Sequence, residues 1–87
     1  MRNREVEWGR VICCNHKCTL GKLSRGTPTS VIIDMRCPKG SRAVGSWHTH
    51  PSSSSRLSPA DWRNLRKAKM KVGCVSGREG LKCYKID

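Results

Sequence analysis

The stretch HTHPSSSSRLSPAD, from His48 to Asp61, joins the end of a predicted strand to the start of the clearest predicted helix. Ser58 can cap that helix, Pro59 fits its first position, and Asp61 in the first turn complements the helix dipole. The serines before this cap predict a flexible polar loop. The segment therefore predicts a strand-to-helix junction, with two histidines before the loop and one aspartate after it.

Two histidines separated by one residue lie on the same side of a strand, because side chains alternate. The imidazoles of His48 and His50 can reach one ion, and Asp61 can supply a third ligand. Such a set leaves a position for water, which is typical of a catalytic zinc site. Zinc activates that water, and a carboxylate must then take its proton. Glu7 is the candidate for this base, and Glu5, on the same predicted face, is the alternative.

The same segment resembles the signature of the JAMM (MPN-plus, Prok-JAB-like) zinc metalloprotease family: His, Ser or Thr, His, Pro, and then Ser-x-x-Asp, with seven residues between His50 and Ser58. Upstream, Glu7 to Ile12 resembles the glutamate, glycine and aliphatic residues of the family's first strand. The resemblance implies that His48, His50 and Asp61 bind Zn²⁺, that Glu7 is the general base and that Ser58 stabilises the oxyanion. It implies a metallopeptidase or isopeptidase acting on protein or peptide substrates, with ubiquitin-like proteins among the candidates.

The chain departs from that family at its start. Family domains are usually longer and begin with a helix before the glutamate, whereas this chain starts almost at Glu7. Two consequences follow from this departure. A JAMM-like domain that folds on zinc without catalysis stays an alternative. Without a helix to cover it, one face of the sheet can be exposed and bind a second copy of the chain, so a homo-oligomer is a further alternative.

Periodicity in the rest of the chain predicts an α+β fold, a small mixed sheet with one main helix. By resemblance, this is a reduced JAMM (cytidine-deaminase-like) domain spanning 1–87. Residues 5–14 alternate as a strand, with Glu5, Glu7, Gly9, Val11 and Cys13 on one face. The β-branched run 31–33 predicts a buried strand. Further strands are expected at 43–47, 72–75 and 81–86, a loop or ragged hairpin at 15–29, and an apolar helical stripe at Trp62, Leu65 and Ala68.

The chain is strongly basic, with 18 Lys and Arg against 6 Asp and Glu and a formal net charge of +12. Such an excess attracts polyanions but does not specify a fold. A nucleic-acid-binding module with structural zinc or none is therefore the second hypothesis. Its contacts would come from the basic loops and from the helix, through Arg63, Arg66, Lys67, Lys69 and Lys71.

Six cysteines would suggest three bridges in a secreted chain. The charged N-terminus contains no signal-peptide run, and no stretch is long enough to span a membrane. We therefore expect a cytoplasmic protein that does not enter membranes, with mostly reduced thiols that pack as small hydrophobes. The Cys14-x-x-x-Cys18 pair, with His16 between, is the weaker candidate for a second metal site.

Overall fold

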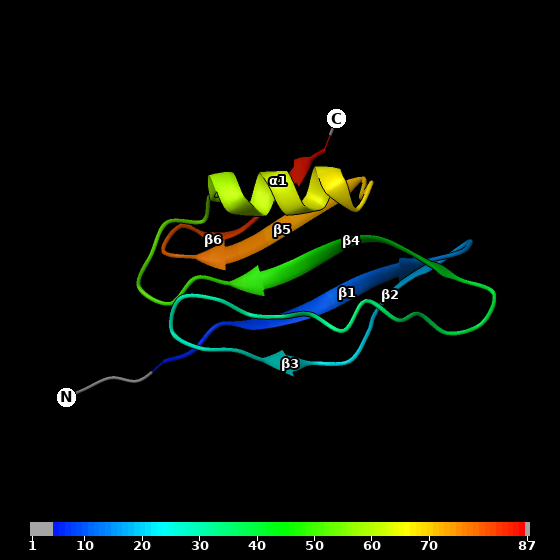
Figure 1. The fold of residues 1–87 in the computed structure, drawn as a ribbon, viewed down its shortest axis with the longest axis horizontal. Coiled ribbons are helices and arrows are strands. Elements are labelled where there is room, and N and C mark those ends of the chain that lie inside the picture. Colours follow the sequence, from blue (N-terminus) through cyan, green and yellow to red (C-terminus); the bar gives the residue numbers. More distant parts are fainter. Residues whose placement is uncertain (1–4, 87) are drawn as a thin grey trace.

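The computed structural model describes residues 5–86, which form a six-stranded mixed sheet with one helix against it (Figure 1). The strand order is β2-β1-β4-β5-β6, and β3 also pairs with β1. β4 and β5 are parallel, and the helix forms the crossover that parallel neighbours need. The predicted α+β fold with a small mixed sheet and one helix is confirmed. The elements are β1 (Trp8–Cys14), β2 (Cys18–Leu20), β3 (Ser24–Arg25), β4 (Arg42–Thr49), α1 (Pro59–Lys67), β5 (Val72–Gly77) and β6 (Gly80–Lys85).

The alternation predicted for the first strand is observed in β1. Gly9, Val11 and Cys13 are buried, while the residues between them are half-buried. Glu7, just before the strand, continues the buried side and is only 8% exposed. Glu5 lies outside the strand and is exposed, so the prediction that both glutamates share one strand face is wrong for Glu5.

The buried strand predicted at 31–33 is not formed. Residues 31–38 have no regular secondary structure, and Ile32 is 92% exposed. β2 and β3 occupy one edge of β1, and β4 occupies the other, so this run has no free edge of β1 or β4 to join. Residues 26–37 instead form a strap that passes beside the sheet, drawn in teal in Figure 1. At its start, the Glu7 N–H donates to the Thr27 carbonyl over 2.8 Å.

Helix α1 begins as the sequence predicts. The Ser58 hydroxyl accepts from the Asp61 N–H, and the Asp61 carboxylate accepts from the Ser58 N–H, which makes a reciprocal capping box. Leu65 is buried on the inner side of the helix and packs into a core with Leu57, Val75 and Ile86. Trp62 packs against this core, whereas Ala68 is the exposed C-cap residue. Burial of Leu65 and Trp62 holds the helix on the sheet, and the prediction that Ala68 continues this apolar stripe is wrong.

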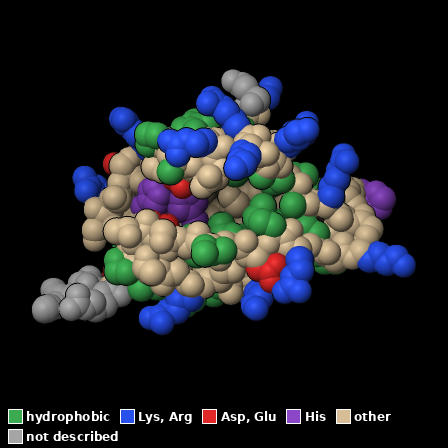
Figure 2. All heavy atoms as spheres, in the orientation of Figure 1, with side chains coloured by type: hydrophobic (Ala, Val, Ile, Leu, Met, Phe, Trp, Pro, Cys, Tyr) green, Lys and Arg blue, Asp and Glu red, His purple; other side chains and the backbone are tan. Residues whose placement is uncertain are grey.

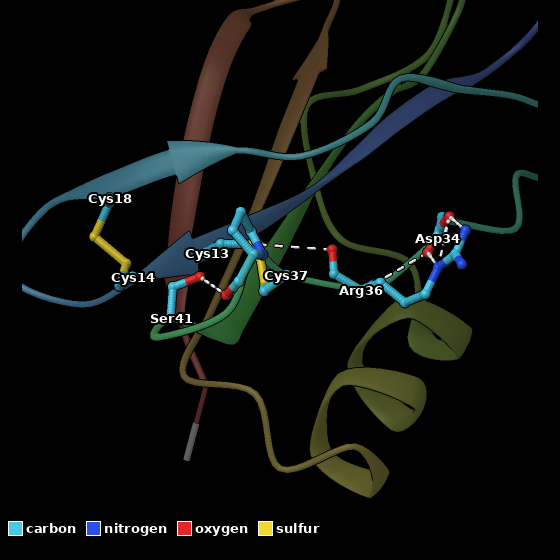
Figure 3. The surroundings of a disulfide bond; sticks show 8 residues. Cys13, Cys14, Cys18, Asp34, Arg36, Cys37 and Ser41 are labelled. Carbon is cyan, nitrogen blue, oxygen red and sulfur yellow. Dashed lines mark hydrogen bonds and ion pairs between the residues drawn. A yellow bond between two sulfur atoms is a disulfide. The ribbon is translucent and has the colours of Figure 1, made fainter.

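The expectation of reduced thiols is wrong, because the structure pairs all six cysteines and leaves none free. The bridges are Cys13–Cys37, Cys14–Cys18 and Cys74–Cys83, the first two being drawn in Figure 3. Two of them follow from strand register, which sets Cys14 opposite Cys18 and Cys74 opposite Cys83. The third ties the end of the strap to β1. The weaker candidate for a second metal site is thereby excluded, since its two cysteines are bonded to each other.

Candidate metal centre

Three separate parts of the chain meet at the C-terminal end of β4. His48 and His50 come from that strand end, and Asp61 comes from the first turn of α1. The antiparallel pairing of β1 with β4 sets Gly9 opposite His48, which brings Glu7 alongside the histidines. In Figure 2, histidine side chains lie in a hollow at the left of the molecule, with acidic atoms beside them.

The donor atoms of His48, His50 and Asp61 form a small triangle. The two histidine Nε2 atoms are 2.9 Å apart, and Asp61 Oδ2 lies 3.2 Å from His48 Nε2 and 3.5 Å from His50 Nε2. A tetrahedral ion with bonds of about 2.0–2.1 Å separates its ligand atoms by roughly 3.3 Å. The three separations are close to that value, so these atoms could hold one ion. Glu7 also offers an oxygen, and its donor atom and those of the two histidines all lie within 4.8 Å of one another. Glu7, His48 and His50 could thus hold a metal ion as well, but the set with Asp61 is tighter.

Hydrogen bonds orient two of these side chains. His50 Nδ1 lies 2.9 Å from the Ser54 carbonyl oxygen, so this nitrogen carries the hydrogen and Nε2 keeps its lone pair for a cation. Asp61 is held by the Ser58 N–H over 2.9 Å. Burial would raise the pKa of Asp61, but hydrogen bonds from His48 and Ser58 outweigh it and hold that pKa at about 2. Asp61 is therefore ionised at neutral pH, which is the form in which a carboxylate could bind a cation.

Of the two candidate glutamates, Glu5 and Glu7, it is Glu7 that lies beside His48 and His50. Burial raises its pKa above the ordinary value, and the neighbouring His48 and His50 partly oppose that effect. A carboxylate with a raised pKa, close to two imidazoles, suits a group that takes up and releases a proton. Glu5 is exposed and lines a second depression, which His50 also borders.

Ser58 lies at the rim of the same site. Its Oγ accepts a hydrogen bond from the Asp61 N–H over 3.1 Å. A serine hydroxyl that accepts one bond still has its own hydrogen to donate. The capping role that the sequence predicts is therefore observed, and it leaves a donor for a second group.

A cleft of about 590 Å³ opens beside these residues. Glu7 and His48 lie in it, the strap forms one wall through Val31, Ile33 and Met35, and α1 forms the other. The walls are mostly apolar, so polar chemistry is concentrated at the end that holds the histidines. The sequence did not predict that the strap forms a wall of this cleft. An irregular segment has no hydrophobic periodicity from which its buried side chains could be identified.

No family model matches this sequence, and no curated protein matches it. The structure is similar to the crystal structure of a JAB1/MPN domain protein from Archaeoglobus fulgidus, with a TM-score of 0.58 and 21% sequence identity over 91% of this chain and 69% of that one. The fold is MPN-like. At this identity the likeness shows the fold alone, so the chemistry of this MPN-like chain has to be argued from its own residues. The expected likeness to cytidine deaminases stays a prediction.

No helix among residues 5–86 is long and apolar enough to cross a membrane. The cytoplasmic location stays a prediction, and the reduced thiols expected to accompany it are not observed.

Proposed function

We propose that this protein is a zinc-dependent metallopeptidase that hydrolyses peptide or isopeptide bonds. His48, His50 and Asp61 would hold the zinc ion, Glu7 would be the general base, and Ser58 would assist at the oxyanion. The observation that carries the proposal is the triangle of donor atoms, 2.9 to 3.5 Å on a side, with a buried carboxylate beside it. Two histidines and one carboxylate leave a coordination position open, as catalytic zinc sites do.

Zinc in such a site lowers the pKa of water and polarises the carbonyl under attack. Glu7 accepts the proton of the attacking water and passes it to the amine nitrogen as the carbon–nitrogen bond breaks. Water is thereby divided between the two products, and Glu7 returns to its ionised form. Ser58 donates its hydroxyl hydrogen to the carbonyl oxygen as negative charge develops there.

The substrate would be an extended segment of a protein lying in the cleft between the strap and α1. Apolar walls favour a segment with apolar side chains, and water is excluded as the segment enters. The +12 charge would attract an acidic protein and speed its encounter. Ubiquitin-like proteins with accessible C-terminal tails are the substrate class that we would test first.

The first experiment measures zinc content and cleavage together. The wild-type chain should carry about one zinc per molecule, and the double variant His48→Ala with His50→Ala should lose it. Glu7→Gln should keep the zinc and lose at least about a hundredfold in turnover, the usual effect of removing a general base. Glu5→Gln is the matched control and should behave as wild type. Absence of zinc from the wild-type chain near neutral pH would contradict the proposal, and inactivity of Glu5→Gln alone would reassign the base.

A zinc-loaded chain that cleaves neither ubiquitin-like fusions nor generic peptides would favour the inactive alternative. Cleavage of either substrate that stops on adding a chelator would exclude that alternative.

Nucleic-acid binding is the second candidate function, and the distribution of the acids favours it. Glu7 and Asp61 lie in the site, Asp34 pairs with Arg36, and Glu79 accepts from the Ser55 N–H. At least four of the six acids thus have local partners, and the 18 Lys and Arg still leave a formal net charge of +12. Titrations with single- and double-stranded nucleic acid at several salt concentrations test this function, because phosphate contacts give a steep salt slope. A flat slope would exclude it.

A further inference from the structure

The loop that follows His50 is held by the turn between β5 and β6. Ser55, in that loop, is completely buried. Its N–H donates to Glu79 Oε1 over 2.7 Å, and its hydroxyl donates to the Gly80 carbonyl over 2.6 Å. The same hydroxyl accepts from the N–H groups of Gly77 and Glu79, over 3.0 and 3.1 Å. The Ser55 hydroxyl therefore makes all three hydrogen bonds that a serine hydroxyl can make, and all of them are to the turn between β5 and β6.

β6 supplies the last contact to the same residue. The Tyr84 hydroxyl donates to the Ser55 carbonyl over 2.7 Å. The N–H, the carbonyl and the hydroxyl of Ser55 are thus all bonded to the β5–β6 hairpin, although Ser55 and Tyr84 are 29 positions apart. An ionised carboxylate at the Ser55 N–H makes one of these bonds charge-assisted and short.

Ser55 is adjacent to the residue that orients a proposed metal ligand. The Ser54 carbonyl oxygen, 2.9 Å from His50 Nδ1, selects the tautomer that leaves Nε2 for a cation. The direction of this carbonyl depends on the peptide plane that Ser54 shares with Ser55. A shift of Ser55 would turn the carbonyl away from His50.

Gly77 shows how closely the two segments pack. A Cβ at this position would lie 2.7 Å from the carbonyl oxygens of both Ser53 and Ser54. Real Cβ atoms essentially never come that close to another heavy atom. The hairpin therefore touches the very carbonyl that orients His50, and a side chain there would displace it.

We infer that Glu79 and Tyr84, acting through Ser55, are positioning residues for His50 as a zinc ligand. This inference rests on the proposed function for the identity of the metal. The contacts that define the clamp (Glu79, Tyr84 and Ser55) are made between protein groups alone. None of the three clamp residues is a fixed residue of the His-x-His and Ser-x-x-Asp pattern, so a chain can match that pattern without having the clamp.

Glu79→Ala and Glu79→Gln are the matched pair that tests the clamp. Both remove the charge, but Gln keeps a carbonyl acceptor for the Ser55 N–H. Glu79→Ala should weaken zinc binding by about 10- to 100-fold, the usual effect of removing a group that orients a ligand. Glu79→Gln should stay within about threefold of wild type. Zinc affinity is measured by competition with a chromophoric chelator.

Two spectroscopic readouts separate positioning from general stability. The visible spectrum of the cobalt-substituted chain should change in Glu79→Ala and Tyr84→Phe, because ligand geometry changes. In the metal-free chain, the ¹⁵N shifts of His50 should report the Nδ1–H tautomer in wild type and a mixture of tautomers in Glu79→Ala. If Glu79→Ala fails to fold, Tyr84→Phe carries the same two measurements.

Lower thermal stability with unchanged cobalt spectrum and unchanged His50 tautomer would overturn the inference, because the clamp would then be merely structural. If the wild-type chain binds no zinc, the proposed function is refuted instead. The tautomer measurement would still decide whether the clamp orients His50.

Discussion

Removing the Cys13–Cys37 bridge should destabilise this protein more than removing Cys74–Cys83. The first pair is 24 positions apart and the second is 9 apart. A crosslink lowers the entropy of the unfolded chain, and the effect grows with the length of the closed loop. The chain-entropy relation gives about 3.5 kcal/mol for Cys13–Cys37 and about 2.7 kcal/mol for Cys74–Cys83. Either value is a large part of the about 5–15 kcal/mol that typically stabilises a domain.

The functional effect of the same change should be confined to the cleft. Cys37 anchors the end of the strap, whose Val31, Ile33 and Met35 form one wall. The proposed zinc ligands lie at the C-terminal end of β4, immediately after it and on α1, away from that anchor. The double serine variant at Cys13 and Cys37 should therefore keep its zinc, while substrate KM rises because the wall is loosened.

Three measurements check this prediction. Mass spectrometry without reductant should find the wild-type chain lighter than its reduced form by two hydrogen masses per bridge. Urea unfolding, followed in chelator, should rank the double serine variant at Cys13 and Cys37 below the matched one at Cys74 and Cys83. Free thiols in the air-oxidised wild type, or the reverse ranking, would refute the reasoning. Loss of zinc in the Cys13 and Cys37 variant would show that the strap holds more than the wall.

Three further outcomes are expected. In chelator, Asp61→Asn should cost about 2 kcal/mol near neutral pH, since the pKa of Asp61 falls from 3.8 to about 2 on folding. Because folding lowers this pKa, the ionised carboxylate stabilises the fold at pH values above the pKa of the unfolded chain. In urea unfolding, the difference between wild type and variant should therefore fade as pH drops from about 4 toward 2. A difference that does not change with pH would contradict the prediction. Leu65→Ala should cost about 3 kcal/mol, because it empties a buried site under α1, and calorimetry giving under about 1 kcal/mol would contradict that packing. If the basic helix face binds nucleic acid, Arg63→Glu with Lys67→Glu should lower the slope of log affinity against log salt by about two; an unchanged slope would place the phosphate contacts elsewhere.

Features that depend on local chemistry could be predicted from the sequence. The start of α1 follows from Ser58, Pro59 and Asp61, because a helix terminus needs donors satisfied within one turn. The alternation of β1 follows from the period of a strand. The His-x-His spacing predicts two imidazoles on one side of a strand end, and in the structure their Nε2 atoms are 2.9 Å apart. The roles of these side chains in zinc chemistry remain proposals.

Features that depend on long-range register were decided only by the tertiary structure. Val31 to Ile33 has strand-forming residues, but the edges of β1 and β4 are already paired, so the run became a strap. Cys74 meets Cys83 because two strands pair at that register, and no local pattern encodes this. Glu7 rather than Glu5 lies at the histidines because β1 pairs with β4 as it does. A single sequence records what each residue prefers locally, whereas the partners that satisfy distant groups are chosen when the whole sheet assembles.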